Sequence, residues 1–467
     1  MKIMLAHQAG DVRSQATSGQ LLVNLYAEMN PEGSKYPFTL YGTPGFSSTA
    51  WADTGSSSGI QGGQVMGDNL YVVSNNTVYK ITTAAAVSTV GTITGTQDIV
   101  DLSNNGTQMV CVTVDGDAFV ITSATVAQIA SNLPANVSSS CFLDGYHVFS
   151  KSDSGQFYIT TSYDCTTIAA DDFATAEESP DNLVRVTSFN SALWLWGTTS
   201  YEVYYNSGNA DFPFEQISGA VNTSRGLLAK MCVSQEDNSM FFIGDDRVAY
   251  RVQGYTPQRV STHAVESEWE GYDTVSDAFG FIYTQAGHKF WIVTFPTEGK
   301  TWVMDIATGM WHQRKSYLLD RLRINGYAKF AGKHLVFDYS NGKIYEWDLD
   351  VYAEAGNTIE RIAEGSVVWK EGDRLIYDMV HLDLDAGVGL ATGQGSDPQV
   401  IMQYSDDGKK TWSNERWTSM GAIGEYFKRI IWRRCGIARE RIFRFKITDP
   451  VKVAITGAYA KVRVCRS

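Results

Sequence analysis

The residues with the clearest chemical potential lie near the C-terminus, where ten residues read YSDDGKKTWS. The spacing S-x-D-x-x-x-T-W is carried by Ser405, Asp407, Thr411 and Trp412. The carboxylate of Asp407 could act in acid–base chemistry, or it could accept hydrogen bonds from N–H groups of a tight turn. In the second case the Thr-Trp pair anchors the following strand in a core. A short motif counts only in its structural context, so one copy favours a hairpin turn over an active-site loop.

This spacing is similar to the Asp box of sialidases and other sugar-handling β-propellers, with Lys409 where a glycine usually stands. A sialidase also needs a clustered set of arginines and a tyrosine nucleophile, and the sequence assigns neither. Acidic pairs such as Asp171-Asp172 and Asp245-Asp246 are numerous, but none stands out as acid and base. We therefore expect no catalytic residues and no enzyme activity. A carbohydrate-binding or sialidase-like propeller is the alternative function.

The metal-ligating and nucleophilic residue types are scattered along the chain. No two histidines stand two or four residues apart, and no C-x-x-C pair occurs. The histidines are His7, His147, His263, His288, His312, His334 and His381, and the cysteines are Cys111, Cys141, Cys165, Cys232, Cys435 and Cys465. We expect the histidines at core or blade-edge positions and the cysteines as small buried hydrophobes. Phosphate-binding and dinucleotide fingerprints are missing too, so no metal and no cofactor is predicted.

The elements that position these residues repeat through the middle of the chain. A polar turn, an apolar strand, a second turn and an aromatic-rich strand recur seven times, as in DNLYVVSNNTVYKI and GKHLVFDYSNGKIYEWD. Equivalent positions in the first strand of each hairpin are Leu70, Met109, His147, Leu193, Met240, Phe290 and Leu335, spaced 38 to 50 residues apart. Hairpins at such a period are typical of propeller blades. The alternative, a large β-sandwich, would need no blade-length period.

The two ends of the chain differ from these repeats. The first 60 residues hold strands broken by Pro-Glu-Gly and Thr-Pro-Gly turns, and longer strands replace the blade period after about Gly365. We therefore predict an all-β protein, a β-propeller of about seven blades with an antiparallel β-sandwich platform built from both ends. The expected division is an N-terminal strand arm over residues 1–60, the propeller over 61–355 and the sandwich over 356–467.

Charge is distributed unevenly along the chain. Residues 401–467 carry 15 Lys and Arg against 6 Asp and Glu, a net of +9, whereas residues 1–400 carry a net of −22. Such a split indicates a partner or a neighbouring subunit rather than a fold. The segment from Tyr426 to Thr448 concentrates the basic residues, and in its second half Phe443, Phe445 and Ile447 alternate with Arg444 and Lys446 as in a strand. This basic strand pair is either a solvated face or a contact surface.

The quoted motifs also carry a resemblance to a known family. The run from Tyr404 to Val462 closely resembles the end of the packaged-DNA stabilisation proteins, the tail hub or nozzle proteins of short-tailed bacteriophages, while Lys409 and Cys435 depart from commoner residues. The N-terminal stretches VNLYAEM and GTPGF are similar to the opening of that family. The resemblance therefore brackets the chain and is weakest through the blades.

The resemblance implies a structural protein of the virion tail, synthesised and assembled in the host cytoplasm. Its implied partners are five further copies in a homo-hexamer, the phage adaptor or head-to-tail connector protein, a tail needle or tip protein, and tail spikes or fibres. Double-stranded DNA would pass through the channel without sequence-specific binding. We expect no membrane insertion, because the chain has neither a signal peptide nor about 18 uncharged apolar residues in a row.

A ring needs one side of each subunit to fit a different side of its neighbour. The basic C-terminal end and the acidic body meet this need, so we expect inter-subunit or adaptor contacts in the C-terminal strands. The residues predicted to make them are Lys428, Trp432, Arg433, Arg434, Arg439, Arg441 and Arg444.

Overall fold

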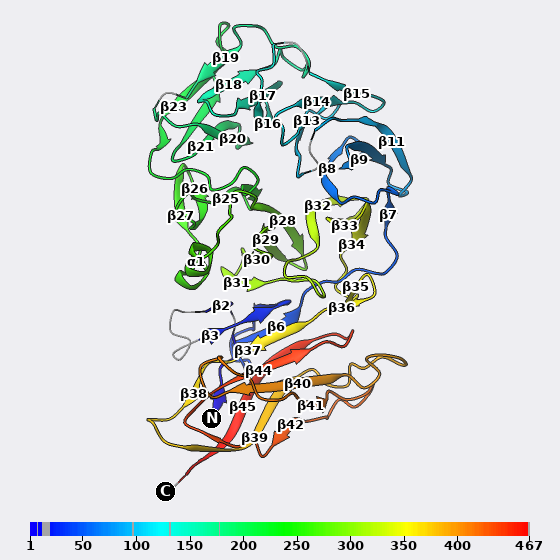
Figure 1. The fold of residues 1–467 in the computed structure, drawn as a ribbon, viewed down its shortest axis with the longest axis vertical. Helices are drawn as coiled ribbons and strands as arrows, with labels where there is room; N and C mark the ends of the chain where they lie inside the picture. The colour runs from blue at the N-terminus through cyan, green and yellow to red at the C-terminus, as the bar shows by residue number, and fades with distance from the viewer. Residues whose placement is uncertain (7, 12–18, 96–97, 130–131, 177, 466–467) are drawn as a thin grey trace.

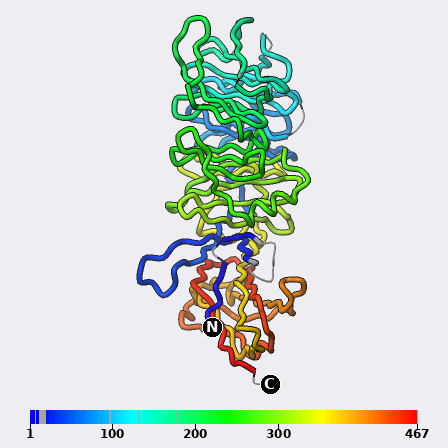
Figure 2. The backbone as a smooth tube through the Cα atoms, turned by 90° about the vertical axis from the view of Figure 1, so that its left-hand side faces the viewer, coloured from blue at the N-terminus to red at the C-terminus, as the bar shows by residue number. Residues whose placement is uncertain are grey.

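The computed structural model describes residues 1–6, 8–11, 19–95, 98–129, 132–176 and 178–465, so the predicted position of His7 lies outside the described residues. The chain forms a disc of four-stranded sheets above a smaller packed pair of sheets (Figure 1). Turned by 90°, the disc is seen edge-on, and both termini lie in the lower part (Figure 2). The all-β fold predicted from the repeats and the two ends is confirmed: a propeller stands on a sandwich.

Six blades are made of four consecutive antiparallel strands each. The first two contain β8 (Ile60–Met66), β9 (Asn69–Ser74), β10 (Thr77–Ile81) and β11 (Val87–Thr92), then β12 (Asp101–Asn104), β13 (Met109–Val112), β14 (Ala118–Ile121) and β15 (Val126–Gln128). The next two contain β16 (Val137–Leu143), β17 (Tyr146–Lys151), β18 (Gln156–Ile159) and β19 (Phe173–Thr175), then β20 (Leu183–Phe189), β21 (Ala192–Gly197), β22 (Tyr201–Asn206) and β23 (Phe214–Asn222). The fifth and sixth contain β24 (Ser234–Glu236), β25 (Ser239–Ile243), β26 (Ala249–Gln253) and β27 (Thr256–Arg259), then β28 (Phe279–Gln285), β29 (His288–Phe295), β30 (Lys300–Asp305) and β31 (Met310–Gln313).

The seventh blade draws on both ends of the propeller sequence. Its strands are β32 (Ile324–Phe330), β33 (Lys333–Asp338), β34 (Lys343–Glu346) and β7 (Ala52–Asp53). β7 comes from the N-terminal arm and pairs antiparallel with β34, Ala52 opposite Ile344. This pairing gives the last blade its outermost strand from the arm that leads into the first blade, and so closes the circle between the two.

The repeated hairpin occupies the same place in every blade. The seven equivalent positions lie in β9, β13, β17, β21, β25, β29 and β33, which begin the predicted hairpins and are the second strands of their blades. The first strands of the blades contact one another, as β8 with β12 and β16 with β20, and so surround the propeller axis. They were passed over because Gly62 and Gly63 of β8, and the Ser138–Ser140 run of β16, lack the apolar pattern of the strands that follow.

The sandwich has two sheets. One contains β42 (Ile430–Arg433), β39 (Leu375–Leu384), β45 (Ala454–Val464), β6 (Phe38–Gly42) and β5 (Leu25–Met29), with β1 (Lys2–Ile3) beside β45 and β43 (Ile437–Ala438) beside β39. The other contains β4 (Leu22–Val23), β37 (Arg361–Glu364), β44 (Glu440–Ile447), β40 (Gln399–Ser405) and β41 (Arg416–Ser419), with β38 (Val368–Trp369) beside β44. Phe443, Phe445 and Ile447 are buried between the sheets, as their alternation predicted.

The N-terminal arm ties the two parts together. β4 pairs with β37 of the sandwich and, through Val23 opposite Gln313, with β31 of the sixth blade, so one sheet runs from the propeller into the sandwich. A hydrophobic core accordingly extends without interruption from Trp194 and Trp291 in the blades to Leu40 and Phe443 in the sandwich. The short hairpins β2 (Gly10–Asp11) with β3 (Gly19–Gln20) and β35 (Ala353–Glu354) with β36 (Asn357–Thr358) lie at this junction.

The described residues contain one α-helix, α1 (His263–Glu270), between the fifth and sixth blades. The Thr262 hydroxyl accepts a hydrogen bond from the Val265 N–H at its N-terminus, as N-cap residues do. Within the described part of the chain, no helix has the length and apolar character needed to cross a membrane.

Candidate assembly surface

The outer face of the β39 sheet brings basic and apolar side chains from three strands into rows. Met379 of β39 stands opposite Arg433 of β42 on one side and Lys461 of β45 on the other. In the next row, His381 stands between Ile431 and Tyr459. Directly opposite residues share a face, and successive residues alternate, so these two rows are on the outer face. The intervening row, which contains Val380, Trp432 and Ala460, is buried against the other sheet.

This outer face carries a positive charge that comes from residues distant in sequence. Arg433 and Lys461 are exposed, and Lys2 joins them because β1 pairs beside β45, Lys2 opposite Tyr459. Burial is the main cause that lowers the pKa of His381, whose ring packs against Tyr459 at 4.7 Å, so His381 stays neutral at pH 7. The surface therefore combines three cations with a neutral aromatic strip.

Acidic partners reduce the excess charge of the C-terminal end. Residues 356–467 together carry 18 Lys and Arg against 14 Asp and Glu, a net of +4, because residues 356–400 are acidic. Asp378 accepts from Arg463 at 2.6 and 2.7 Å, and Asp383 pairs with Lys35 of the arm. Arg433 and Lys461 are thus exposed basic groups on this face, whereas Arg463 and Lys35 have their charges balanced by Asp378 and Asp383.

The structure divides the seven residues predicted for contacts into two groups. Lys428, Arg433, Arg434 and Arg439 are exposed. Of the other three, Trp432 and Arg441 are buried and Arg444 is half-buried; Trp432 donates its indole N–H to the Arg416 carbonyl at 2.8 Å. A contact role for all seven stays a prediction. The side chains of Trp432, Arg441 and Arg444 have partners within the chain, and so do those of Lys428, with Glu425, and Arg439, with the Gly372 carbonyl.

Arg441 is a buried structural residue. Its guanidinium donates two hydrogen bonds to the Asp406 carboxylate, at 2.6 and 2.7 Å, and another to the Cys435 carbonyl. It also lies over the ring of Tyr404 at 3.8 Å and that of Tyr377 at 4.5 Å. A planar, bidentate and stacked arrangement of this kind is what arginine provides and lysine does not.

Arg444 belongs to a buried ion cluster. Its guanidinium donates to Glu364 at 2.7 Å and lies 3.7 Å from the Trp412 ring. Lys409 reaches the same carboxylate at 2.6 Å, and the Glu364 side chain is fully buried. The lysine that stands where an Asp box usually has glycine therefore holds the hairpin to strands β37 and β44.

The Asp-box residues form the turn that the motif predicted. The Asp407 carboxylate accepts from Ser405 Oγ at 2.8 Å and from the Thr411 N–H at 3.0 Å, while Ser405 Oγ accepts from the Lys409 N–H at 2.9 Å. Hydrogen bonds from the Thr411 hydroxyl and N–H lower the pKa of Asp407 to about 2. This carboxylate is engaged by its own turn. Trp412 is only half-buried under Arg444, so the expectation that it anchors a core was wrong.

The loop before β42 exposes apolar side chains that the sequence reasoning missed. Ile423, Tyr426 and Phe427 are exposed, and the Phe427 ring is 99% accessible. Backbone hydrogen bonds from Glu425 to Ala422 and from Lys428 to Glu425 hold the loop in shape. The run AIGEYF, which follows Gly421 and contains Gly424, is a sequence signal that could have indicated an exposed apolar turn.

The histidines and cysteines lie mainly in the interior. Burial lowers the pKa of His147 to about 4 and that of His312 to about 3. His147, His288, His312 and His381 are buried, His334 is half-buried, and His263 is exposed. All the cysteines are free; five are buried, and Cys465, contrary to expectation, is half-exposed. Among the residues that the structure describes, no three His, Cys, Asp or Glu side chains are grouped to hold a metal ion.

Comparison with known proteins gives two family-model matches that follow one another along the chain. Residues 1–352 match the model described as Bacteriophage P22 Gp10, beta-propeller, and residues 360–463 match Bacteriophage P22 Gp10, beta-sandwich. No curated relative matches the chain. Among solved structures, the WD40 β-propeller domain of Doa1 has a TM-score of 0.42 at 11% identity, covering 65% of this chain and 96% of that one. The computationally designed Ika8 protein has a TM-score of 0.39 at 12% identity, covering 73% and 99%.

Proposed function

We propose, from the premise that this chain belongs to the Bacteriophage P22 Gp10 family of phage structural proteins, that it is the tail hub or nozzle of a short-tailed phage. In this role six copies form a ring below the portal and its adaptor. The ring continues the DNA channel, retains the packaged genome and releases it at ejection. The needle or tip protein and the spikes or fibres attach to the same tail.

The observation that carries this proposal is the paired match. The propeller and the sandwich match two family models in the order in which the chain folds them. The matches therefore cover both ends, where the resemblance is strongest, and the blades, where it is weakest. The structure supports the proposal because β4 makes one continuous sheet from the sixth blade into the sandwich, as a rigid ring subunit requires.

The experiment is reconstitution with the adaptor complex, followed by negative-stain microscopy. The proposal predicts six-fold rings that carry seven-bladed discs. Isolated discs beside unoccupied adaptor complexes, at concentrations where the adaptor itself is intact, would contradict it.

A conduit should not bind its cargo tightly. Duplex DNA carries one charge per about 1.7 Å, so a lumen rich in Lys and Arg would bind it through counterion release. The chain has a net charge of −13, and residues 1–400 carry −22. The ring should therefore bind duplex DNA weakly; tight binding that weakens steeply with salt, measured on the assembled ring, would count against a passive channel.

A non-enzymatic role follows from the family and from the Asp-box geometry. Asp407 is engaged by Ser405 and Thr411, and its pKa is low, so it is a poor general acid at neutral pH. The purified protein should not hydrolyse a fluorogenic sialoside; turnover that a point mutation in this chain abolishes would overturn this part of the proposal.

A further inference from the structure

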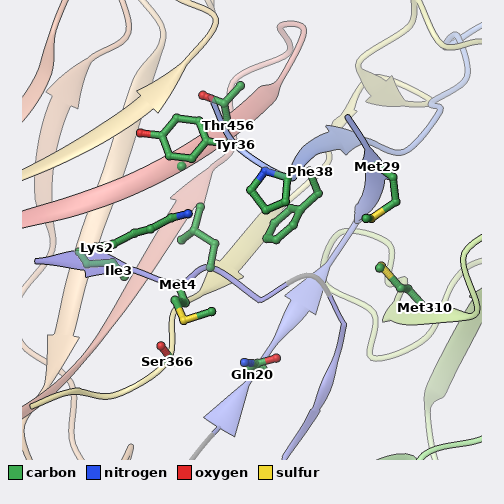
Figure 3. A pocket seen from close by; sticks show the side chains of 13 residues that line it. Lys2, Ile3, Met4, Gln20, Met29, Tyr36, Phe38, Met310, Ser366 and Thr456 are labelled. Carbon is green, nitrogen blue, oxygen red and sulfur yellow. The ribbon is translucent and has the colours of Figure 1, made fainter. Parts of the chain in front are cut away.

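A cavity of about 320 Å³ opens where the N-terminal arm meets the sandwich and the sixth blade (Figure 3). Strands β1 and β6 lie end to end along one edge of β45, β1 at Ala458 and Tyr459 and β6 at Ala454 and Ile455. Between these two strands, Thr456 and Gly457 of β45 line the cavity. Tyr36 closes one wall against Gly457, where a Cβ atom would lie 2.4 Å from the ring.

The lining of this cavity is apolar and rich in methionine. Met29 and Met310 approach from one side and Met4 from the other, with Phe38 between them (Figure 3). Met4 is 63% exposed and Met29 is 55% exposed, so the cavity mouth is an apolar surface open to solvent. Methionine side chains adapt their shape to an incoming group, and exposed apolar concavities mark binding sites. Lys2 is the charged residue of the lining.

A convex apolar tip lies on the turn from Ser316 to Arg321 that connects β31 to β32. Leu318 is 86% exposed, and Tyr317 beside it is also exposed. Two backbone hydrogen bonds shape the turn, from Leu319 N to Ser316 O at 3.1 Å and from Ser316 N to Arg321 O at 3.2 Å. Asp320, two residues after Leu318, is exposed as well.

Leu318 is also strained. Its φ is +57°, in the left-handed region that suits glycine or asparagine and that a branched side chain occupies at a cost of about 1–2 kcal/mol. Tyr163 of the third blade combines exposure with a similar φ, so strain alone does not mark a contact. Leu318 differs because it forms an apolar pair with Tyr317 at the tip of a turn that also carries Asp320.

The tip and the cavity lie at opposite ends of β31. β31 begins at Met310, in the cavity lining, and the turn with Leu318 lies beyond its other end. The hairpin of residues 30–37, which connects β5 to β6, projects to one side below the disc, at the level of the sandwich (Figure 2). A protrusion at one site and a hollow at a different site of the same chain produce head-to-tail contacts, which close into rings when the rotation allows.

We propose that the methionine-lined cavity receives Tyr317 and Leu318 of a second copy of this chain. The apolar tip enters the apolar cavity, and Asp320 of the tip comes near Lys2 at the mouth, so the charges are complementary. This contact deepens the proposed ring by naming its apolar interface. It adjoins the basic outer face of the β39 sheet, with which it shares Lys2.

Cysteine cross-linking tests the contact directly. The variant Leu318→Cys with Met29→Cys, in a Cys465→Ser background, is oxidised at high concentration and, separately, after mixing with the adaptor complex. The proposal predicts a ladder of disulfide-linked multimers on non-reducing gels, because a disulfide forms only when the Cβ atoms approach to about 3.5–4.5 Å. The control is Tyr163→Cys with Met29→Cys, since Tyr163 is also exposed (73%) and at φ +58° but belongs to the third blade.

Two outcomes would overturn the proposal. A ladder no stronger than the control under both conditions excludes the contact, and if rings are nonetheless visible in the microscope, only this inference fails and the proposed function stands. The second readout is Leu318→Gly, which removes strain. Its melting temperature should equal or exceed that of the wild type while association weakens about tenfold or more. Unchanged association, as expected for the matched Tyr163→Gly, would refute the proposal.

Discussion

Glu364 is a buried acid of the sandwich that balances the charge of two basic side chains. Its buried carboxylate faces Arg444 and Lys409 at 2.6 Å each. Replacing it by glutamine leaves two cations in the interior without their counter-ion, and removing one partner of a buried pair costs about 3–5 kcal/mol. We therefore predict that Glu364→Gln lowers the free energy of unfolding by that amount, measured by denaturant titration.

The matched control is Glu415→Gln. Glu415 pairs with Lys446 at 2.9 Å on the surface of the same domain, where an ion pair is worth about 0–1 kcal/mol. Equal losses of unfolding free energy in the two variants would show that the Glu364 ion cluster stabilises the fold no more than a surface ion pair does.

His147 gives the stability a pH dependence whose sign follows from its burial. Its folded pKa is about 4, while an unfolded histidine titrates near 6.5, so the unfolded chain binds more protons between these values. Stability is fully present above pH 6.5 and is lost as the pH falls toward 4, with a slope for this residue approaching about 1.4 kcal/mol per pH unit.

The variant His147→Gln should therefore have a shallower acid limb than the wild type in unfolding measurements between pH 6.5 and 4. The remaining slope comes in part from His312, whose pKa is also lowered by burial. If His147→Gln leaves the wild-type slope unchanged, the buried imidazole is not the source of the pH dependence.

Single residues show where sequence reasoning ends. The alternation of Phe443, Arg444 and Phe445 predicted that the two phenylalanines face the core, and both are buried there. It could not reveal that Arg441 is buried, because its partner Asp406 is 35 positions away and on another strand. A count of charges treats Arg441 and Arg444 alike, whereas the fold shows that Arg441 pairs with Asp406 and Arg444 with Glu364.

At the scale of elements, the two-residue strand β7 has an effect far beyond its length. Ala52 is buried with Ile60, Leu70 and Phe337 between the first and seventh blades. An aspartate there places a charge in an apolar contact and opposes closure of the circle. We predict that Ala52→Asp lowers the free energy of unfolding by at least about 3 kcal/mol, whereas Asp53→Asn, at the exposed neighbouring position, changes it by about 0.5 kcal/mol or less.

Circular dichroism and denaturant titration of the two variants would check this. Similar unfolding midpoints for Ala52→Asp and the wild type would mean that the seventh blade does not need the arm.

The elements that the sequence predicted are those with a strong local pattern. The second strand of each blade was found because it is almost wholly apolar, as in β21 and β25. β7 and β4 were not found, because a strand of two residues has no period and its pairing depends on residues about 290 and 340 positions away. The expectation that both chain ends build the platform held because β1, β4, β5 and β6 all pair there, but only the structure shows that the arm also closes the propeller.

For the whole molecule, the basic outer face of the β39 sheet should orient the subunit in its ring. Arg433 and Arg434 are exposed, and their backbone groups alone take part in hydrogen bonds with Arg416 and Asp378. We predict that Arg433→Glu with Arg434→Glu weakens assembly of adaptor-bound rings while the melting temperature stays within a few degrees of the wild type. If the folded double variant assembles normally, also at raised salt, these arginines make no contact between subunits.

The central claim is that this chain is a ring-forming component of a phage tail, and cryo-electron microscopy of tails from virions that carry it tests this most directly. The account predicts six copies around the DNA channel below the head-to-tail connector, each with a seven-bladed disc joined through β4 to its sandwich. It further predicts that the turn carrying Leu318 of one copy lies at the methionine-lined cavity of the next. Absence of the chain from purified virions, or its presence only at sites away from the channel, would contradict the account.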